Sequence, residues 1–310
     1  MILDSLTIDP EAFAARTGWA IKPEGACKGE VCVALPGARQ ADGLLDARVV
    51  AQRLGMALVS DAAHGLYALG PESAITGRAL TTAEAPDISL PDLTGTVALD
   101  TAGAEAAHPW IEAAAPEHPS LIDAGHILDE RFGVINVPNG VWIDERGIIV
   151  RPAEPAWPGS TPVLDMLKEP GRADLPPASV EVRDQIAKMH IDPQRYLDML
   201  LDWAEKGSSS QYVLTPEQVI ARSEPRSADA ARAAAHFELG QHLHLAGDHL
   251  AAVPHFRESH RLQPSNWTYK RQAWNLESVD TVTGVSAYEG SWLADVLAIG
   301  ADNYYPAIEA

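Results

Sequence analysis

The sequence predicts an α/β protein with an α+β extension before the main domain and an α-helical domain after it. Over residues 84–152, apolar runs of strand length alternate with helical patterns, which favours a three-layer domain built on a parallel sheet. From residue 180 onward the pattern becomes helical. The 310 residues suffice for two domains that each bury a core. The predicted parts are an N-terminal α+β unit (1–83), the α/β domain (84–152), a Pro- and Gly-rich linker (153–180) and a helical domain (181–310).

The N-terminal unit combines short helices with a hairpin. Asp9 is a suitable N-cap with Pro10 behind it, so a helix is expected to begin there. A second helix is expected over residues 46–54. Apolar runs at residues 56–59 and 66–69 flank a polar turn, which predicts a β-hairpin. Between the helices, a Gly- and Pro-rich stretch carries the two cysteines of the chain, Cys27 and Cys32.

In the α/β domain, strands are expected at residues 96–100 and 120–123. Helices are expected over residues 103–115 and 126–132. The domain closes with a hairpin that follows Val137-Pro138 and turns at Asp144-Glu145-Arg146-Gly147.

The helical domain is expected to hold helices over residues 185–206 and 215–222, the latter opened by a capping box at Thr215. Residues 233–266 fit one tetratricopeptide (TPR) repeat, in which Gly240 lets two antiparallel helices approach and Phe256 fills the gap between them. A further helix is expected over residues 266–276. Because about three repeats are needed for a free-standing array, this one is expected to pack on the α/β domain or on another subunit.

The charge balance excludes some classes of binding partner. Lys and Arg number 23 against 43 Asp and Glu, which gives a net charge of −20 and argues against nucleic acid and anionic membranes. No apolar run approaches the roughly 18–20 residues that span a bilayer, and the N-terminus lacks the features of a signal peptide. We therefore expect a cytoplasmic protein that uses no cofactor. Its expected partners are a protein, small-thiol or peroxide substrate, a protein bound by the TPR-like region, and a further copy of the chain.

Three segments carry a family resemblance, and the helical tail adds to it more loosely: APDISLPDLTG (85–95), VALDTAGAEAAHPWI (97–111) and HPSLIDAGHILDERFGVINVPNGVWIDERGIIVRP (118–152). They resemble the redoxin branch of thioredoxin-like proteins, the TlpA/ResA-like group. The resemblance implies a thioredoxin-like fold with Pro138 at the family's cis-proline position, where the Val137 backbone pairs with a bound peptide strand. It also implies that Asn139 and Trp142 line that groove, although a core position in an alternating strand is the stronger interpretation for Trp142 alone.

The family's reactive Cys-x-x-Cys pair is missing. In that group, a strand and the helix with the cysteines precede the VALD strand, whereas Gly95-Thr96 joins the flanking segments directly here. A sheet without its first strand would have an open edge. We therefore expect the N-terminal unit to fill the gap, with the strand at 56–59 or at 66–69 in the vacant place.

The candidate catalytic residues are Cys27 and Cys32. A glycine between them permits a turn that brings the sulfurs together. Lys28 and Lys22 favour a thiolate and Glu30 opposes it, so Cys27 is predicted to attack a disulfide or peroxide and Cys32 to resolve the intermediate. The alternative is a pair of buried small side chains without chemistry.

Three functions follow from these observations. The first is a thiol-disulfide oxidoreductase or thiol peroxidase-like protein. The second is a redox-inactive thioredoxin-like scaffold that binds proteins through its TPR-like region. The third is a protein that handles soft metals or organometals with the thiol pair, joined by one histidine of the helical domain, since thiolate and imidazole suit copper(I) or zinc. The default expectation for those histidines is a solvated surface; they are His236, His242, His244, His249, His255 and His260.

Overall fold

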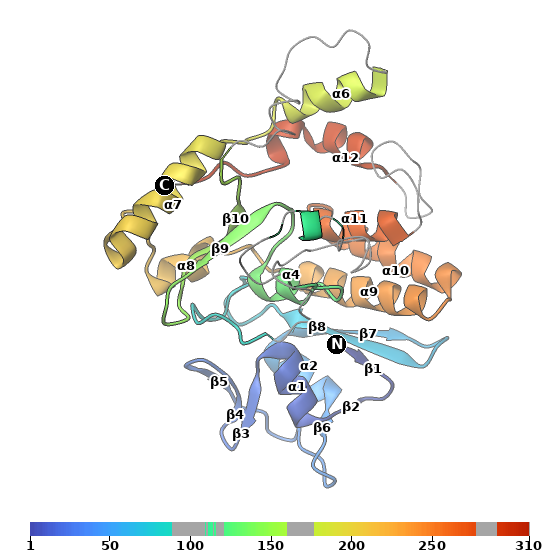
Figure 1. Ribbon diagram of the computed structural model, residues 1–310. Coiled ribbons are helices and arrows are strands. Elements are labelled where there is room, and N and C mark those ends of the chain that lie inside the picture. Colours follow the sequence, from blue (N-terminus) through green and yellow to red (C-terminus); the bar gives the residue numbers. More distant parts are fainter. Residues whose placement is uncertain are drawn as a thin grey trace.

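The computed structural model describes residues 1–88, 109, 111–113, 115, 121–159, 177–276 and 290–309. The expected strand at 96–100, most of the expected helix at 103–115 and the Gly95-Thr96 junction lie outside these residues. Within them the protein is mixed α/β, with small sheets near the N-terminus and helices toward the C-terminus (Figure 1). Every strand pair of the described residues is antiparallel, so they show no thioredoxin-like parallel sheet.

The N-terminal unit contains the two helices and the hairpin that its sequence predicts. The Asp9 carboxylate caps helix α1 by accepting hydrogen bonds from the backbone N–H groups of Glu11 and Ala12, at 3.0 and 2.8 Å. The elements are β1 (Ile2–Leu3), β2 (Thr7–Ile8), α1 (Pro10–Thr17), β3 (Ala20–Lys22), β4 (Gly25–Lys28), β5 (Val31–Val33), β6 (Leu45–Asp46), α2 (Ala47–Leu54), β7 (Met56–Asp61) and β8 (Leu66–Glu72).

One of the two three-stranded sheets of the N-terminal unit has the strand order β1-β8-β7. Phe13, Trp19 and Leu54 belong to the apolar core of the unit. Against the sheet packs α9 (Ala228–Leu245), and the contact is so close that a Cβ on Gly70 would lie 2.2 Å from the Ala231 carbonyl oxygen. Strand β8 pairs with β7 on one side and with β1 on the other, so neither β7 nor β8 pairs with the hairpin of the predicted α/β domain (Figure 1).

That second hairpin is formed as predicted. It consists of β9 (Asn139–Ile143) and β10 (Ile149–Pro155), which follow α4 (Ile127–Phe132). The Asp144 carboxylate fixes its turn by accepting from the backbone N–H groups of Arg146 and Ile148, both at 2.9 Å. The segment that leaves the N-terminal unit runs alongside, because the Ile149 N–H donates to the Ala83 carbonyl at 2.7 Å.

The remaining chain is helical. The Thr215 capping box is formed, and α9 and α10 make the expected antiparallel pair, in which a Cβ on Gly240 would lie 3.0 Å from the Phe256 ring. The single helix expected over 185–206 is wrong, because the chain breaks before Asp192-Pro193 and starts a new helix there. These helices are α6 (Pro177–Ile186), α7 (Pro193–Lys206), α8 (Pro216–Arg222), α9, α10 (His249–Leu262), α11 (Trp267–Leu276) and α12 (Trp292–Ile299).

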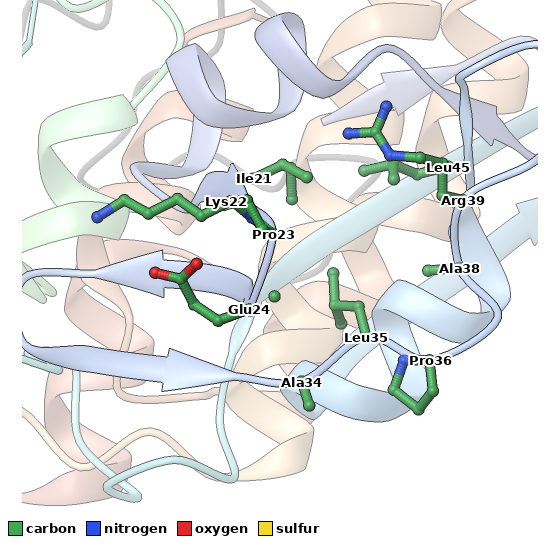
Figure 2. Close-up of a pocket in the computed structure, with 11 residues that line it drawn as sticks. Ile21, Lys22, Pro23, Glu24, Ala34, Leu35, Pro36, Ala38, Arg39 and Leu45 are labelled. Atoms are coloured by element: carbon green, nitrogen blue, oxygen red, sulfur yellow. The ribbon is translucent and has the colours of Figure 1, made fainter.

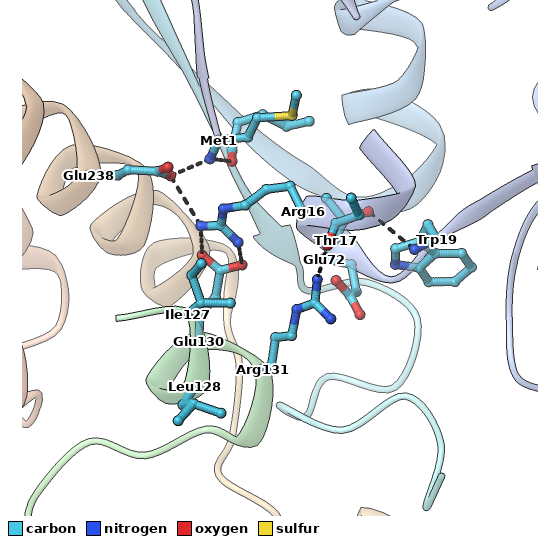
Figure 3. A network of polar contacts seen from close by, with 12 residues as sticks. Met1, Arg16, Thr17, Trp19, Glu72, Ile127, Leu128, Glu130, Arg131 and Glu238 are labelled. Carbon is cyan, nitrogen blue, oxygen red and sulfur yellow. Dashed lines mark hydrogen bonds and ion pairs between the residues drawn. The ribbon is translucent and has the colours of Figure 1, made fainter. Parts of the chain in front are cut away.

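A buried ionic network connects the N-terminal unit to α4 and α9 (Figure 3). Arg16 donates to both carboxylate oxygens of Glu130, at 2.8 and 2.9 Å, and reaches Glu238 at 3.4 Å; the Met1 amino group pairs with Glu238 from the other side. Burial opposes the charge on Glu130, yet Arg16 holds the pKa of that carboxyl at about 2. The N-terminal unit is thus held to α4 and α9 by paired charges.

Candidate functional site

The structure brings the two cysteines together. Cys27 on β4 and Cys32 on β5 stand directly opposite each other and form a disulfide, with their Cα atoms 4.1 Å apart. The turn between the strands passes through Gly29, whose positive φ of 56° suits a glycine. The strands are local in sequence, so the disulfide closes a short loop on the outer sheet β3-β4-β5.

The two cysteines differ in their access to solvent. Cys27 is only 3% exposed, whereas Cys32 is exposed. The lysine expected to activate Cys27 is directed elsewhere: the Lys28 ammonium lies 2.7 Å from the Glu72 carboxylate and 5.8 Å from the centre of the Trp19 ring. Successive side chains of a strand point to opposite faces, so Lys28 and Cys27 do not share one. Access therefore favours Cys32 as the first sulfur to react.

A carboxylate stands beside the sulfurs. One oxygen of Glu24 and the sulfurs of Cys27 and Cys32 all lie within 4.8 Å of one another. Glu24 is held there by the tight turn between β3 and β4, where Lys22 pairs with Gly25. Gly25 permits this geometry, because a Cβ at that position would lie 2.1 Å from the Val33 carbonyl oxygen. Sequence reasoning considered Glu30 and missed Glu24; the only signal was its position three residues before Cys27.

A cavity of about 650 Å³ adjoins this site (Figure 2). Figure 2 shows the side chains of Lys22 and Glu24 extending along the strands, away from Leu35 and Arg39 on the other side of the pocket. Its wall is mainly apolar and includes Ile21, Pro23, Leu35, Pro36, Ala38 and Leu45.

The predicted substrate groove has a different character. The Val137–Pro138 peptide bond is cis. The Val137 carbonyl accepts a hydrogen bond from the Tyr305 hydroxyl at 2.8 Å, and the Val137 N–H donates to the Asn136 side chain at 2.9 Å. Both backbone groups that would pair with a peptide thus have partners in the chain itself.

The other two groove residues are partly or fully enclosed. Trp142 is 2% exposed, stacks on Trp203 with ring centres 4.9 Å apart and donates to the Tyr196 hydroxyl at 2.9 Å. The interpretation of Trp142 as a core residue is therefore confirmed. Asn139 is half-buried at the start of β9, and its side-chain oxygen has no hydrogen-bond partner among the described residues.

The cysteine hairpin and the Pro138 loop form two separate groups. Ala26, next to Cys27, packs in the cluster that contains Trp19, whereas Trp142 packs with Tyr196 in another. In Figure 1 the strands β3–β5 lie at the outer edge of the N-terminal unit, and β9 and β10 lie on the far side of β8.

The histidines of α9 and α10 do not approach the sulfurs as metal ligands. Within the described part of the chain, the group of candidate ligands around the disulfide contains Glu24 and no histidine. His236 and His255 contact each other through their Nδ1 atoms at 3.1 Å, and His255 lies 3.4 Å from the Asp61 carboxylate. Burial, with the neighbouring His255, lowers the pKa of His236 to about 4, so this histidine is neutral at pH 7.

Comparisons of the chain with protein-family models, curated proteins and solved structures find no match. Among the described helices, none is both long and apolar enough to cross a membrane.

Proposed function

We propose that the protein is a thiol-disulfide oxidoreductase whose reactive group is the Cys27–Cys32 pair. The observation that carries the proposal is a cross-strand disulfide between one buried and one exposed cysteine, with a carboxylate within 4.8 Å of both sulfurs. The proposed location is the cytoplasm, where disulfides that persist are rare and those that form are usually catalytic or redox-sensing.

The proposed reaction is a pair of exchange steps. The thiolate of reduced Cys32 attacks one sulfur of a substrate disulfide, forms a mixed disulfide and releases the other substrate sulfur as a thiolate. The Cys27 thiolate then attacks the Cys32 sulfur, which releases the second substrate thiolate and closes the Cys27–Cys32 disulfide. Glu24, with a carboxylate oxygen within 4.8 Å of both sulfurs, accepts the thiol proton as a general base.

The neighbouring cavity, which Glu24 lines, favours a substrate that carries a bulky group on its sulfur. The cavity of about 650 Å³ beside Glu24 has room for a small thiol or for one side chain of a peptide. A peroxide would use the same sulfur in its first step, with a sulfenic acid on Cys32 in place of the mixed disulfide.

We also propose a thioredoxin-like origin for residues 84–152, with the Pro138 loop serving as scaffold. The β9–β10 hairpin and the helix α4 before it support it. The α9–α10 pair, with Gly240 against Phe256, supports a TPR-like contribution from the helical region.

The test is a redox titration of the full chain in graded mixtures of an oxidised and a reduced small thiol, with alkylation of free thiols and mass analysis. We expect one reversible two-electron transition that involves Cys27 and Cys32 together. The matched variants C27S and C32S should show no such transition. Thiols in the wild-type chain that stay reduced across the range, or a disulfide that no buffer reduces, would remove the proposal.

A further inference from the structure

We propose that the reduced hairpin is a zinc site, in which the thiolates of Cys27 and Cys32 and the carboxylate of Glu24 bind one Zn²⁺ and a water completes the coordination. The inference rests on the proposed function and deepens it, because it names the ion that stabilises the reduced form of the cysteine pair.

The three ligand atoms already converge. They lie within 4.8 Å of one another, and each comes from a different part of one small sheet: the β3–β4 turn, β4 and β5. Zn–S bonds of about 2.3 Å and Zn–O bonds of about 2.0–2.2 Å in a tetrahedron place neighbouring ligand atoms roughly 3.4–3.8 Å apart. Small side-chain rotations after reduction of the disulfide therefore suffice to form the site.

The backbone that carries the ligands is fixed in two places. Cys27 and Cys32 are paired across the β4–β5 ladder. The β3–β4 turn is held by the close approach of Gly25 to the Val33 carbonyl. Because Glu24 and Cys32 are exposed, an ion and its water have direct access from solvent.

The ligand set selects the metal. Two thiolates favour a soft or borderline cation, which disfavours Mg²⁺ and Ca²⁺. A carboxylate oxygen is a hard ligand, which disfavours Cu(I). Zn²⁺ accepts both ligand types at four-coordinate sites, and sites with three protein ligands keep one position open. The proposed ion is therefore exchangeable.

Zinc binding is coupled to the redox state of the cysteine pair through the protons and electrons that are exchanged. Binding of Zn²⁺ to the two thiols releases two protons to solvent. A low-molecular-weight disulfide then oxidises the two thiolates, which close the Cys27–Cys32 bond, while the oxidant becomes two thiolates and Zn²⁺ is released. Since only the reduced form binds the ion, zinc shifts the redox midpoint toward the dithiol by mass action.

The test uses the full chain, reduced with a phosphine and freed of metal, and titrated with Zn²⁺ against a chromophoric chelator. We expect one ion per chain, and with Co²⁺ a thiolate-to-metal charge-transfer band. E24Q should weaken zinc affinity by about tenfold or more, because the loss of a group that supports a metal site typically lowers metal affinity by at least that factor. E30Q, an acid-to-amide change in the β4–β5 turn, should bind like the wild type, and C32S should lose the charge-transfer band.

Three outcomes would overturn the zinc site: no stoichiometric binding by the wild type, equal affinities for E24Q and E30Q, or binding that survives in the C27S/C32S double variant. The redox titration with a chelator present separates the two proposals. A reversible couple without zinc binding removes only the zinc site. Zinc binding by a chain whose thiols never form the disulfide removes only the oxidoreductase.

Discussion

The cysteine hairpin and the Pro138 loop differ in whether their polar and reactive atoms are accessible to a substrate. On the hairpin, Cys32 is exposed, and a carboxylate oxygen of the exposed Glu24 lies within 4.8 Å of its sulfur. On the loop, the Val137 carbonyl and N–H are both bonded within the chain, to Tyr305 and Asn136. A motif that resembles half of an active site therefore acts here as a packed junction. Access decides which of the two regions can meet a substrate.

Several aromatic side chains pack over the Pro138 loop and cover the Val137 backbone. Tyr305 and its neighbour Tyr304 pack edge to face with ring centres 4.7 Å apart, and Tyr304 packs in the same way on Trp267 at 4.6 Å. The Asn136 side chain donates to the Tyr304 carbonyl at 3.1 Å. A peptide that paired with Val137 would have to displace this aromatic cluster as well as one hydrogen bond.

The largest predicted effect separates the two regions by activity. The substitution C32S should abolish reduction of a small disulfide by the chain, because the attacking sulfur is gone. Y305F, which changes the cover of the loop, should leave the rate unchanged. Both rates can be followed by the release of a coloured thiol. Activity that survived in C32S, or that fell in Y305F, would move the chemistry toward the loop.

The next effect concerns the contact that holds the N-terminal unit to α4. E130Q leaves the Arg16 guanidinium buried without its bidentate partner, and a broken buried pair typically costs about 3–5 kcal/mol of unfolding free energy. The control is E258Q, which breaks a more exposed pair with Arg261 and should cost less than about 1 kcal/mol. Denaturant titration measures both. Equal losses would show that the network in Figure 3 contributes little.

The same network predicts a pH dependence. The pKa of Glu130 is about 2 in the folded chain against an ordinary value of 4.5, so its ionised form stabilises the fold above pH 4.5. That contribution falls as pH drops from about 4.5 toward 2, since protonation then favours the unfolded chain. Unfolding midpoints measured across this interval should decline less steeply for E130Q than for the wild type. Parallel declines would assign acid sensitivity to other carboxyls.

The smallest effect tests the cover itself. Y305F removes the hydroxyl that donates to Val137 and should cost about 0.5–1.5 kcal/mol of unfolding free energy. The control Y212F removes the same hydroxyl from another tyrosine. The hydrogen bonds of Tyr212 among the described residues use its backbone, and none reaches the Pro138 loop. Calorimetry of the two variants compares them directly. A loss for Y212F as large as that for Y305F would argue against a specific bond to Val137.

Local features of the fold follow from the sequence. The Asp9 cap, the Thr215 capping box and the Asp144 turn depend on a few neighbouring residues, and each forms as predicted. The pairing of Cys27 with Cys32 belongs to the same class, because a glycine turn between two short strands suffices.

The remaining features depend on contacts between distant parts of the chain. Helix α9 covers the N-terminal sheet because Gly70 leaves room for the Ala231 carbonyl, and no local pattern connects those positions. The Tyr305 bond to Val137 spans 168 residues. The proximity of Glu24 to the sulfurs depends on the β3–β4 register, in which Lys22 pairs with Gly25. That register can be predicted only when the ends of both strands are known.

The proposed role of Cys32 is tested by locating the first bond that forms between the oxidised chain and a small thiol. The chain is mixed with reduced glutathione, quenched with acid after short times, and its glutathione adducts are mapped by mass spectrometry. We predict a mixed disulfide on exposed Cys32 with Cys27 released as a free thiol. An adduct on Cys27, or a disulfide that glutathione does not open, would contradict the account.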